Sequence, residues 1–214
     1  CVNTAMGSSA MQLNTTGDNN VAIGGSTLFN NTTADNNTAV GATAMVANTT
    51  GADNTAVGSG ALDANTTAIN NTAVGKTALG ANTTGHRNTS IGKDSMAVST
   101  TGDCNVAVGW ASLNANTTAN NNTAVGILAL AANTEGAHNV AVGARAGDAN
   151  TTGTQNTFVG GDYNGGPGGA NTTGGCNTFI GNDSGMKNTT GSFSTSVGAE
   201  SSCNGTTSHS NAAL

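Results

Sequence analysis

The pentapeptide Asn71–Gly75, Asn-Thr-Ala-Val-Gly, recurs along the chain at a constant spacing. Its closing glycine returns every 17 residues from Gly7 to Gly160, then after 21 residues at Gly181 and after 17 more at Gly198. Twelve copies in one register, with a single slip of four residues, indicate a stacked repeat architecture. In such an array each repeat is one coil, and it buries its apolar side chains only against its neighbours.

The composition differs from that of a typical globular domain. Charged residues make up 7% of the 214 residues and aromatic residues 3%, whereas typical domains contain roughly 25% charged residues. Much of the hydrophobic fraction of 36% is alanine, so bulky side chains cannot build a large central core. Such polar content often indicates disorder, but a disordered chain has no need of Val, Ile or Met before every closing glycine.

We number each coil from the first residue of the pentapeptide, so that the closing glycine is position 5. The pentapeptide is predicted to be a short β-strand, because position 2 is Thr or Val and position 4 is always Val, Ile or Met. Side chains alternate along a strand, and we expect positions 2 and 4 to face inward. The position-4 row is then the core ladder: Met6, Ile23, Val40, Val57, Val74, Ile91, Val108, Val125, Val142, Val159, Ile180 and Val197.

A second apolar signal lies at position 9, which is Leu or Met from Met11 to Leu130, and position 11 is often Ala. These positions predict a second strand, and Asn-Thr-Thr-Gly or Asn-Thr-Thr-Ala at positions 12 to 15 predicts the turn after it. Stacked at about 4.8 Å per coil, such coils pair their strands in parallel. We therefore predict an all-β parallel β-solenoid, or β-roll, of about twelve 17-residue coils with two short strands in each.

The chain is expected to form a single solenoid domain over residues 1–214. Its coils are regular over 1–136 and irregular over 137–214, where an insertion at 161–170 lengthens one step of the repeat. Because the sequence begins and ends inside a coil, we expect a segment of a longer array or a filament subunit.

The insertion also supplies a candidate recognition loop. Tyr163 lies within it, and Phe158 and Phe179 stand at position 3 of two flanking coils, where outward-facing rings would form a small aromatic patch. Two alternatives remain open, namely a surface bulge without a function and phenylalanines that pack against another subunit.

No constellation of residues indicates catalysis. His86 and His138 lie about three coils apart, or roughly 14 Å, which is too far for them to share a metal ion. The acidic residues are scattered over the turns and lack the spacing of calcium-binding repeats. We therefore expect no enzymatic activity, no cofactor and no metal site.

Charge and hydropathy exclude two classes of partner. The net charge is −6 with five basic residues, so the chain has no electrostatic footprint for nucleic acid. No apolar run approaches about 18 residues, so no membrane span is expected in this segment. Cys104 and Cys176 lie about four coils apart, or roughly 19 Å, which favours free thiols or bonds between subunits over a disulfide within the chain.

Asn-x-Thr/Ser sequons recur at the second turn and have two interpretations. In a protein secreted from a eukaryote they are candidate glycosylation sites. In a stack, the same amides can bond from coil to coil, and this ladder is favoured because glycans on successive coils would crowd at about 4.8 Å. The candidate glycosylation sites are Asn14, Asn31, Asn48, Asn65, Asn82, Asn116, Asn150, Asn171 and Asn188.

The repeat Asn-Thr-Ala-Val-Gly-x-x-Ala-Leu-x-Ala-Asn-Thr-Thr-Gly resembles the head repeats of trimeric autotransporter adhesins. It is also similar to the Asn-Thr-Ala-Ile-Gly repeats of tail-fibre-like proteins of phages, algal viruses and marine bacteria. The resemblance covers the whole chain, although Asn-Thr-Thr lengthens the second turn beyond that of the adhesin repeat. It implies a left-handed parallel β-roll that trimerises, with small residues at position 3 in close contact between protomers. It also implies a location outside the cell, on a cell surface or on a virion.

Two functions follow as hypotheses. The first is a structural extracellular fibre or adhesin-like protein, a rigid spacer that associates with itself as a homotrimer or filament and binds a cell-surface glycan or protein. The second is an ice-binding solenoid, in which threonines at position 13 form a regular array of hydroxyl and methyl groups. That row is Thr15, Thr32, Thr49, Thr66, Thr83 and Thr100.

Overall fold

The computed structural model describes residues 2–161, 166–202, 207 and 212–213. Within these residues the chain forms β-strands and turns and no helix. It divides into two compact units, Cys1–Asn105 and Val106–Leu214. Both units are built from the same coil, and the expectation of a single domain over 1–214 stays a prediction.

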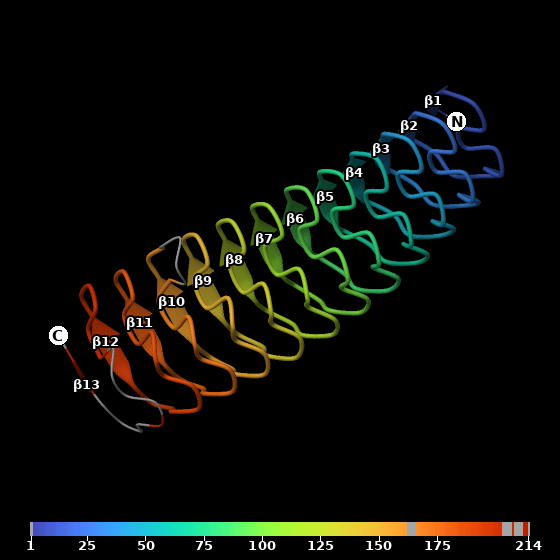
Figure 1. Ribbon diagram of the computed structural model, residues 1–214. Coiled ribbons are helices and arrows are strands. Elements are labelled where there is room, and N and C mark those ends of the chain that lie inside the picture. The colour runs from blue at the N-terminus through green and yellow to red at the C-terminus, as the bar shows by residue number, and fades with distance from the viewer. Residues whose placement is uncertain (1, 162–165, 203–206, 208–211, 214) are drawn as a thin grey trace. The chain divides into compact units, whose positions relative to one another are not determined.

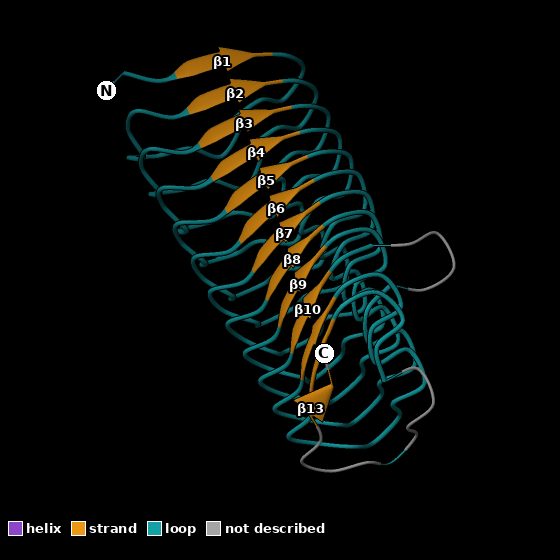
Figure 2. Ribbon diagram, turned by 90° about the vertical axis from the view of Figure 1, so that its left-hand side faces the viewer, coloured by secondary structure: helices purple, strands orange, loops and turns teal. Residues whose placement is uncertain are grey.

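Each coil contributes one strand to a parallel sheet, and the rest of the coil is turn and loop (Figures 1 and 2). The strands of the first unit are β1 (Thr4–Met6), β2 (Val21–Ile23), β3 (Thr38–Val40), β4 (Thr55–Val57), β5 (Thr72–Val74) and β6 (Thr89–Ile91). Those of the second unit are β7 (Val106–Val108), β8 (Thr123–Val125), β9 (Val140–Val142), β10 (Thr157–Val159), β11 (Thr178–Ile180), β12 (Thr195–Val197) and β13 (Ala212–Ala213).

Within each unit, successive strands pair in parallel with equivalent positions opposite each other. Thr55 of β4 pairs with Thr72 of β5, for example. The register is kept across the insertion, because Thr157 of β10 pairs with Thr178 of β11 although 21 residues separate them. The extra residues therefore leave the sheet unchanged, and the predicted parallel β-solenoid with a 17-residue spacing is confirmed.

The second strand predicted for each coil does not form. Its residues make a turn in which positions 7 and 9 are left-handed, as at Thr43 (φ 57°) and Met45 (φ 52°). Left-handed geometry at non-glycine residues is uncommon and interrupts an extended segment. The turn nevertheless bonds to the next coil, because the Met45 N–H donates to the Ala61 carbonyl at 3.0 Å and the Ala47 N–H to the Asp63 carbonyl at 3.0 Å.

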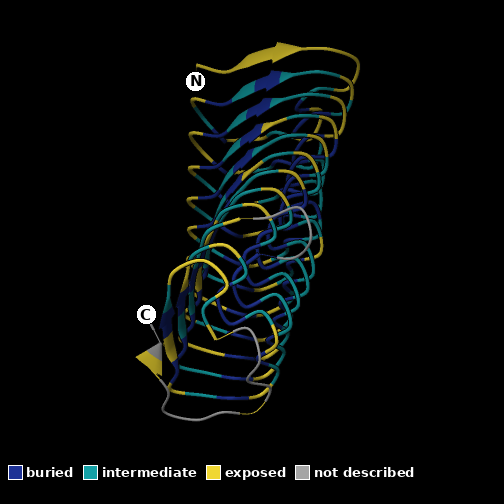
Figure 3. Cartoon of the chain, turned by 60° about the vertical axis from the view of Figure 1, so that its left-hand side comes forward, coloured by how far each residue is buried: buried dark blue, intermediate teal, exposed yellow. Residues whose placement is uncertain are grey.

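The interior of the coil is lined by the middle residue of the strand, position 3. Ala22, Ala39, Ala56 and Ala73 are completely buried there, and Figure 3 shows the centres of β2–β4 in dark blue. Leu or Met at position 9, a small residue such as Ala44 or Ala61 at position 8, and Asn at positions 1 and 12 are also buried in the regular coils. The core is therefore narrow and repeats coil by coil.

The position-4 row lies on the outer face of the strands, so its prediction as the core ladder is wrong. Met6 is 62% exposed, Ile91 39% and Val57 36%, and the other members of the row are half-buried or exposed. Alternation along a strand shows which residues share a face, but a shift of one residue exchanges the inner face for the outer one. Alanine at position 3 is the side chain small enough to lie inside beside Leu or Met at position 9.

Phe158 and Phe179 also point inward and are buried, so the predicted outward aromatic patch is wrong. Their ring centroids lie 6.0 Å apart in successive coils. Both occupy position 3, which faces the interior from β2 to β12 for the reason just given. Tyr163, the third residue of the predicted recognition loop, lies outside the described residues.

Candidate functional site

Two buried asparagine ladders join each coil to the next. At position 1, Asn20 Oδ1 accepts the Asn37 backbone N–H at 2.9 Å, and Asn37 Nδ2 donates to the Gly51 carbonyl at 2.9 Å. At position 12, Asn48 Nδ2 donates to Asn31 Oδ1 and to the Gly51 carbonyl, both at 3.0 Å. These bonds satisfy the amides of Asn37 and Asn48 inside the coil, where an unpaired amide would cost stability.

The candidate glycosylation residues all belong to the position-12 ladder. All are buried except Asn14, which is half-buried, and the Asn65 and Asn82 amides donate to the preceding coil in the same way as Asn48. An N-linked glycan is attached at Nδ2, and this atom has neither exposure nor a free direction in the folded coil. Burial opposes glycosylation of the eight buried residues in the folded coil, that of Asn14 stays a prediction, and the coil-to-coil asparagine ladder is confirmed.

The threonines at position 13 form a third ladder at the same turn. Thr49 Oγ1 donates to the Thr66 carbonyl at 3.0 Å, and the same carbonyl accepts the backbone N–H groups of Thr49 (3.0 Å) and Thr50 (3.2 Å). These hydroxyl groups donate within the stack, and their side chains are half-buried in most coils. The exposed threonines are those of position 14, such as Thr50 and Thr67.

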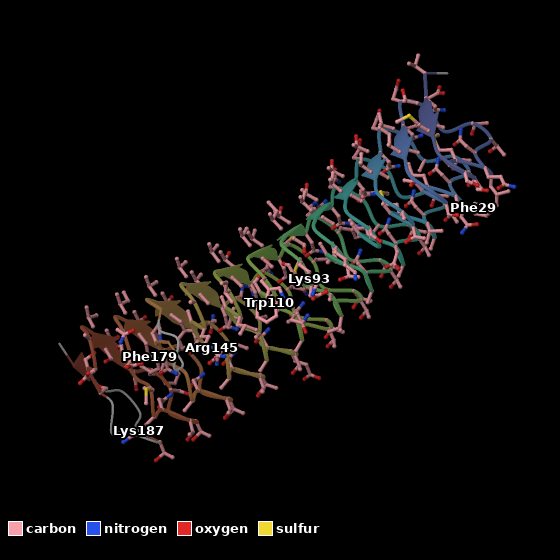
Figure 4. All side chains as sticks on the ribbon, turned by 45° about the horizontal axis from the view of Figure 1, so that its top comes forward. Phe29, Lys93, Trp110, Arg145, Phe179 and Lys187 are labelled. Carbon is pink, nitrogen blue, oxygen red and sulfur yellow. The ribbon has the colours of Figure 1, made fainter. Side chains whose placement is uncertain are left out.

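The outer side of the strands is an uncharged surface on which the same kinds of side chain repeat from coil to coil. We call it the strand face: the residues at positions 2 and 4 of β1–β12, all of which are Thr, Val, Ile or Met. Side chains project outward along the line of the strands in Figure 4. β-Branched side chains are stiff at χ1, and parallel strands repeat every 4.7–4.9 Å, so within each unit the face is a regular array of methyl and hydroxyl groups.

Charged residues lie at the turns and not on the strand face. Lys93 pairs with Asp94 at 3.3 Å, and Arg145 pairs with Asp148 at 3.5 Å. The Thr77 hydroxyl donates to Asp94, and this bond lowers the pKa of the carboxyl group from its ordinary value. Burial raises the pKa of Asp148, and the nearby Arg145 opposes that change.

Among the residues that the structure describes, histidine and cysteine side chains do not gather into a site. His86 Nδ1 accepts the Ile69 N–H at 3.0 Å, and the His86 N–H donates to Asp103 Oδ1 at 2.6 Å, so this histidine is part of a turn ladder. Cys104 and Cys176 are free thiols. Among the described residues there is no group of three His, Cys, Asp or Glu side chains that could hold a metal ion, and no helix is long and apolar enough to span a membrane.

Sequence reasoning missed the strand face, because it placed the same residues in the core. It also missed Trp110 and Ile127, which are 49% and 53% exposed at position 6, at a corner that borders this face. The signal was present: the other residues at position 6 are small or hydrophilic in the rest of the chain. No protein-family model, curated protein or solved structure matches the chain.

Proposed function

We propose that the chain is a structural repeat protein of an extracellular fibre or adhesin-like assembly, which serves as a rigid spacer and attachment surface and associates with copies of itself. Its place is on a cell surface or a virion, where a glycan or protein is the target of attachment. Stiffness follows from the bonding, because strand, turn, asparagine and threonine ladders all connect one coil to the next.

The observation that carries the proposal is the strand face. A row of outward Val, Ile and Met side chains with no charge among them is costly to leave in water, and contiguous apolar surface of this kind marks interaction sites. A second copy presents the same period and the same stiff side chains, so the two faces match in spacing. Contact between protomers through small residues at position 3, which the resemblance implied, is contradicted because position 3 faces the interior.

The test places charges on the strand face. In the double variant Val57→Glu with Val74→Glu, both changes lie on outward positions, so the coil still folds while like charges oppose association. The matched control, Thr67→Glu with Thr84→Glu, changes two exposed residues of the same two coils at position 14. Sedimentation analysis and electron microscopy of wild-type protein should show oligomers or filaments that persist in the control and are lost in the strand-face variant. A wild-type chain that stays monomeric at all accessible concentrations contradicts the proposal.

Ice binding is the second candidate, and the strand face favours it more than the threonines at position 13 do. Most coils carry Thr at position 2, and its hydroxyl group lies beside the methyl groups of position 4 in a regular array. The threonines at position 13 instead donate their hydroxyl groups within the stack. A monomer with strong thermal hysteresis, abolished by Val57→Glu with Val74→Glu, would replace the fibre proposal with this one.

A further inference from the structure

The chemistry of position 6 differs between the first unit and the start of the second. In the first unit the residues there are Ser8, Gly25, Ala42, Ser59, Lys76 and Lys93. The second unit begins instead with Trp110 and Ile127, two large apolar side chains that are about half exposed. Trp110, labelled in Figure 4, is the single tryptophan of the chain.

The two residues stand next to each other on successive coils. Each follows its strand by two residues, Trp110 after β7 and Ile127 after β8, and these strands pair in register. The Leu128 N–H donates to the Trp110 carbonyl at 3.0 Å, which holds the two turns side by side. Trp110 and Ile127 therefore form one apolar spot at the corner that borders the strand face; we call this pair the corner spot.

A regular face does not by itself determine how two copies align. Sliding one copy by a whole coil brings Val, Ile and Thr onto Val, Ile and Thr again, so successive registers have nearly the same contact energy. Register is weakly specified wherever a surface is flat and repetitive. A residue that does not recur from coil to coil is needed to favour one register over the others.

The strand face is also small for a stable interface. A three-residue strand is about 10 Å long and about 4.8 Å from its neighbour, so it offers roughly 50 Å² and six strands offer about 300 Å². Stable interfaces bury about 800 Å² on each partner. Aromatic side chains bury about 150–250 Å² each, and tryptophan is enriched among the residues that dominate binding energy.

We propose that the corner spot, Trp110 with Ile127, sets the register between two copies of this chain that meet through their strand faces. The inference rests on the self-association proposed above. The occupant is the second copy because the corner spot continues the uncharged strand face, and because an extra apolar contact adds to the small area of this face and interrupts its coil-by-coil repetition. A glycan or an unrelated protein on the corner spot are outcomes that the experiment separates.

The experiment measures register directly. The four cysteines, Cys1, Cys104, Cys176 and Cys203, are replaced by serine, and Thr152→Cys, an exposed position 14 away from the strand face, carries a nitroxide label. Pulsed dipolar spectroscopy then reports distances between copies. The parent protein should give one distance, whereas Trp110→Ala with Ile127→Ala should give several, separated by steps of about 4.8 Å, with association weakened about tenfold.

Leu13→Ala with Val98→Ala, which removes exposed apolar side chains at position 11, is the matched control and should keep the single distance.

The outcomes distinguish the two proposals. If the parent protein does not associate, both the proposed self-association and this inference are wrong. A parent protein that associates with many distances, or a Trp110→Ala with Ile127→Ala variant that keeps one distance and full affinity, overturns the inference and leaves self-association standing. Unchanged association with a loss of binding to a glycan or another protein would assign the corner spot to that ligand and equally overturn the inference.

Discussion

The ring of Phe179 fills the space that a side chain at Gly185 would need. A Cβ atom at Gly185 would lie 2.7 Å from Cγ and Cδ2 of that ring. Phe158 fills the space at Gly147 and Gly168 in the same way. In regular coils Ala at position 3 accompanies Leu or Met at position 9, and here Phe accompanies Gly, so large and small residues have exchanged places across the coil. The leucine row ends after Leu130 because the aromatic rings replace it.

Combining Phe179→Ala with Gly185→Leu should restore part of the stability that each single variant loses. We expect Phe179→Ala to lower the free energy of unfolding by about 3–5 kcal/mol through the cavity it leaves, and Gly185→Leu to lower it by at least about 1–3 kcal/mol through overpacking. The double variant recreates the regular coil, in which Leu at position 9 adopts the same left-handed backbone (φ 62° at Gly185, 53° at Leu79). Denaturant unfolding of the four proteins should therefore give a double-variant loss smaller than the sum of the single losses. Strict additivity would contradict the packing exchange.

Neighbouring threonines of one turn should differ in what their hydroxyl groups contribute. Thr49→Val removes a hydroxyl group that donates to the Thr66 carbonyl, and we expect a loss of about 0.5–1.5 kcal/mol in unfolding free energy. Thr50→Val, one residue further, changes an exposed side chain and should alter stability by less than about 0.5 kcal/mol. Equal losses in thermal or chemical unfolding would show that the position-13 ladder does not stabilise the stack.

Removing one amide from the asparagine ladder should cost more than removing the threonine hydroxyl. Asn65→Ala deletes the Nδ2 group that donates to Asn48 Oδ1 at 2.7 Å and to the Ala68 carbonyl at 3.2 Å. The Ala68 carbonyl keeps the Asn54 Nδ2 group as a donor at 2.8 Å, whereas Asn48 Oδ1 is buried and loses this bond, and a buried acceptor left unpaired costs about 1–3 kcal/mol. Thr67→Ala, an exposed change in the same turn, is the control and should be nearly neutral. A loss for Asn65→Ala that is no larger than the control's would contradict the role of the ladder.

Two aspartates should affect the pH dependence of stability with opposite signs. Burial raises the pKa of Asp63 above 3.8, so the folded state binds this proton more tightly than the unfolded state does. At neutral pH the ionised, partly buried carboxylate therefore lowers the free energy of unfolding, and this loss disappears as pH falls. Asp63→Asn should therefore stabilise the protein at pH 7 relative to wild type, and the difference should shrink as pH falls through the raised pKa toward 3.8.

Asp94 supplies the comparison. The Thr77 hydroxyl group lowers the pKa of Asp94 below 3.8, so the stability it contributes is present above 3.8 and is lost as pH falls through the lowered value. Asp94→Asn should be the more weakly folded protein at pH 7, with a difference that disappears in acid. Unfolding curves at a series of pH values check both signs, and two variants that behave alike would contradict the assignment.

Much of the architecture could be read from the sequence. The 17-residue period predicted parallel stacking and the strand at each pentapeptide, and the pairing of Thr55 with Thr72 confirms the register. The coil-to-coil asparagine ladder was also foreseen as one of two interpretations. The strand face was not, because Val57 and its equivalents satisfy the alternation equally well inside or outside.

The sequence by itself determined the unit, its length and its parallel stacking, because these depend only on a repeated pattern and on backbone hydrogen bonds that any such repeat can form. The tertiary structure decided which side chains of the strands and turns point inward. Inside a coil this narrow, steric fit admits Ala at position 3 with Leu at position 9, or Phe with Gly, and turns the β-branched residues outward. Packing volume is a property of the closed coil, and the linear pattern of apolar residues does not contain it.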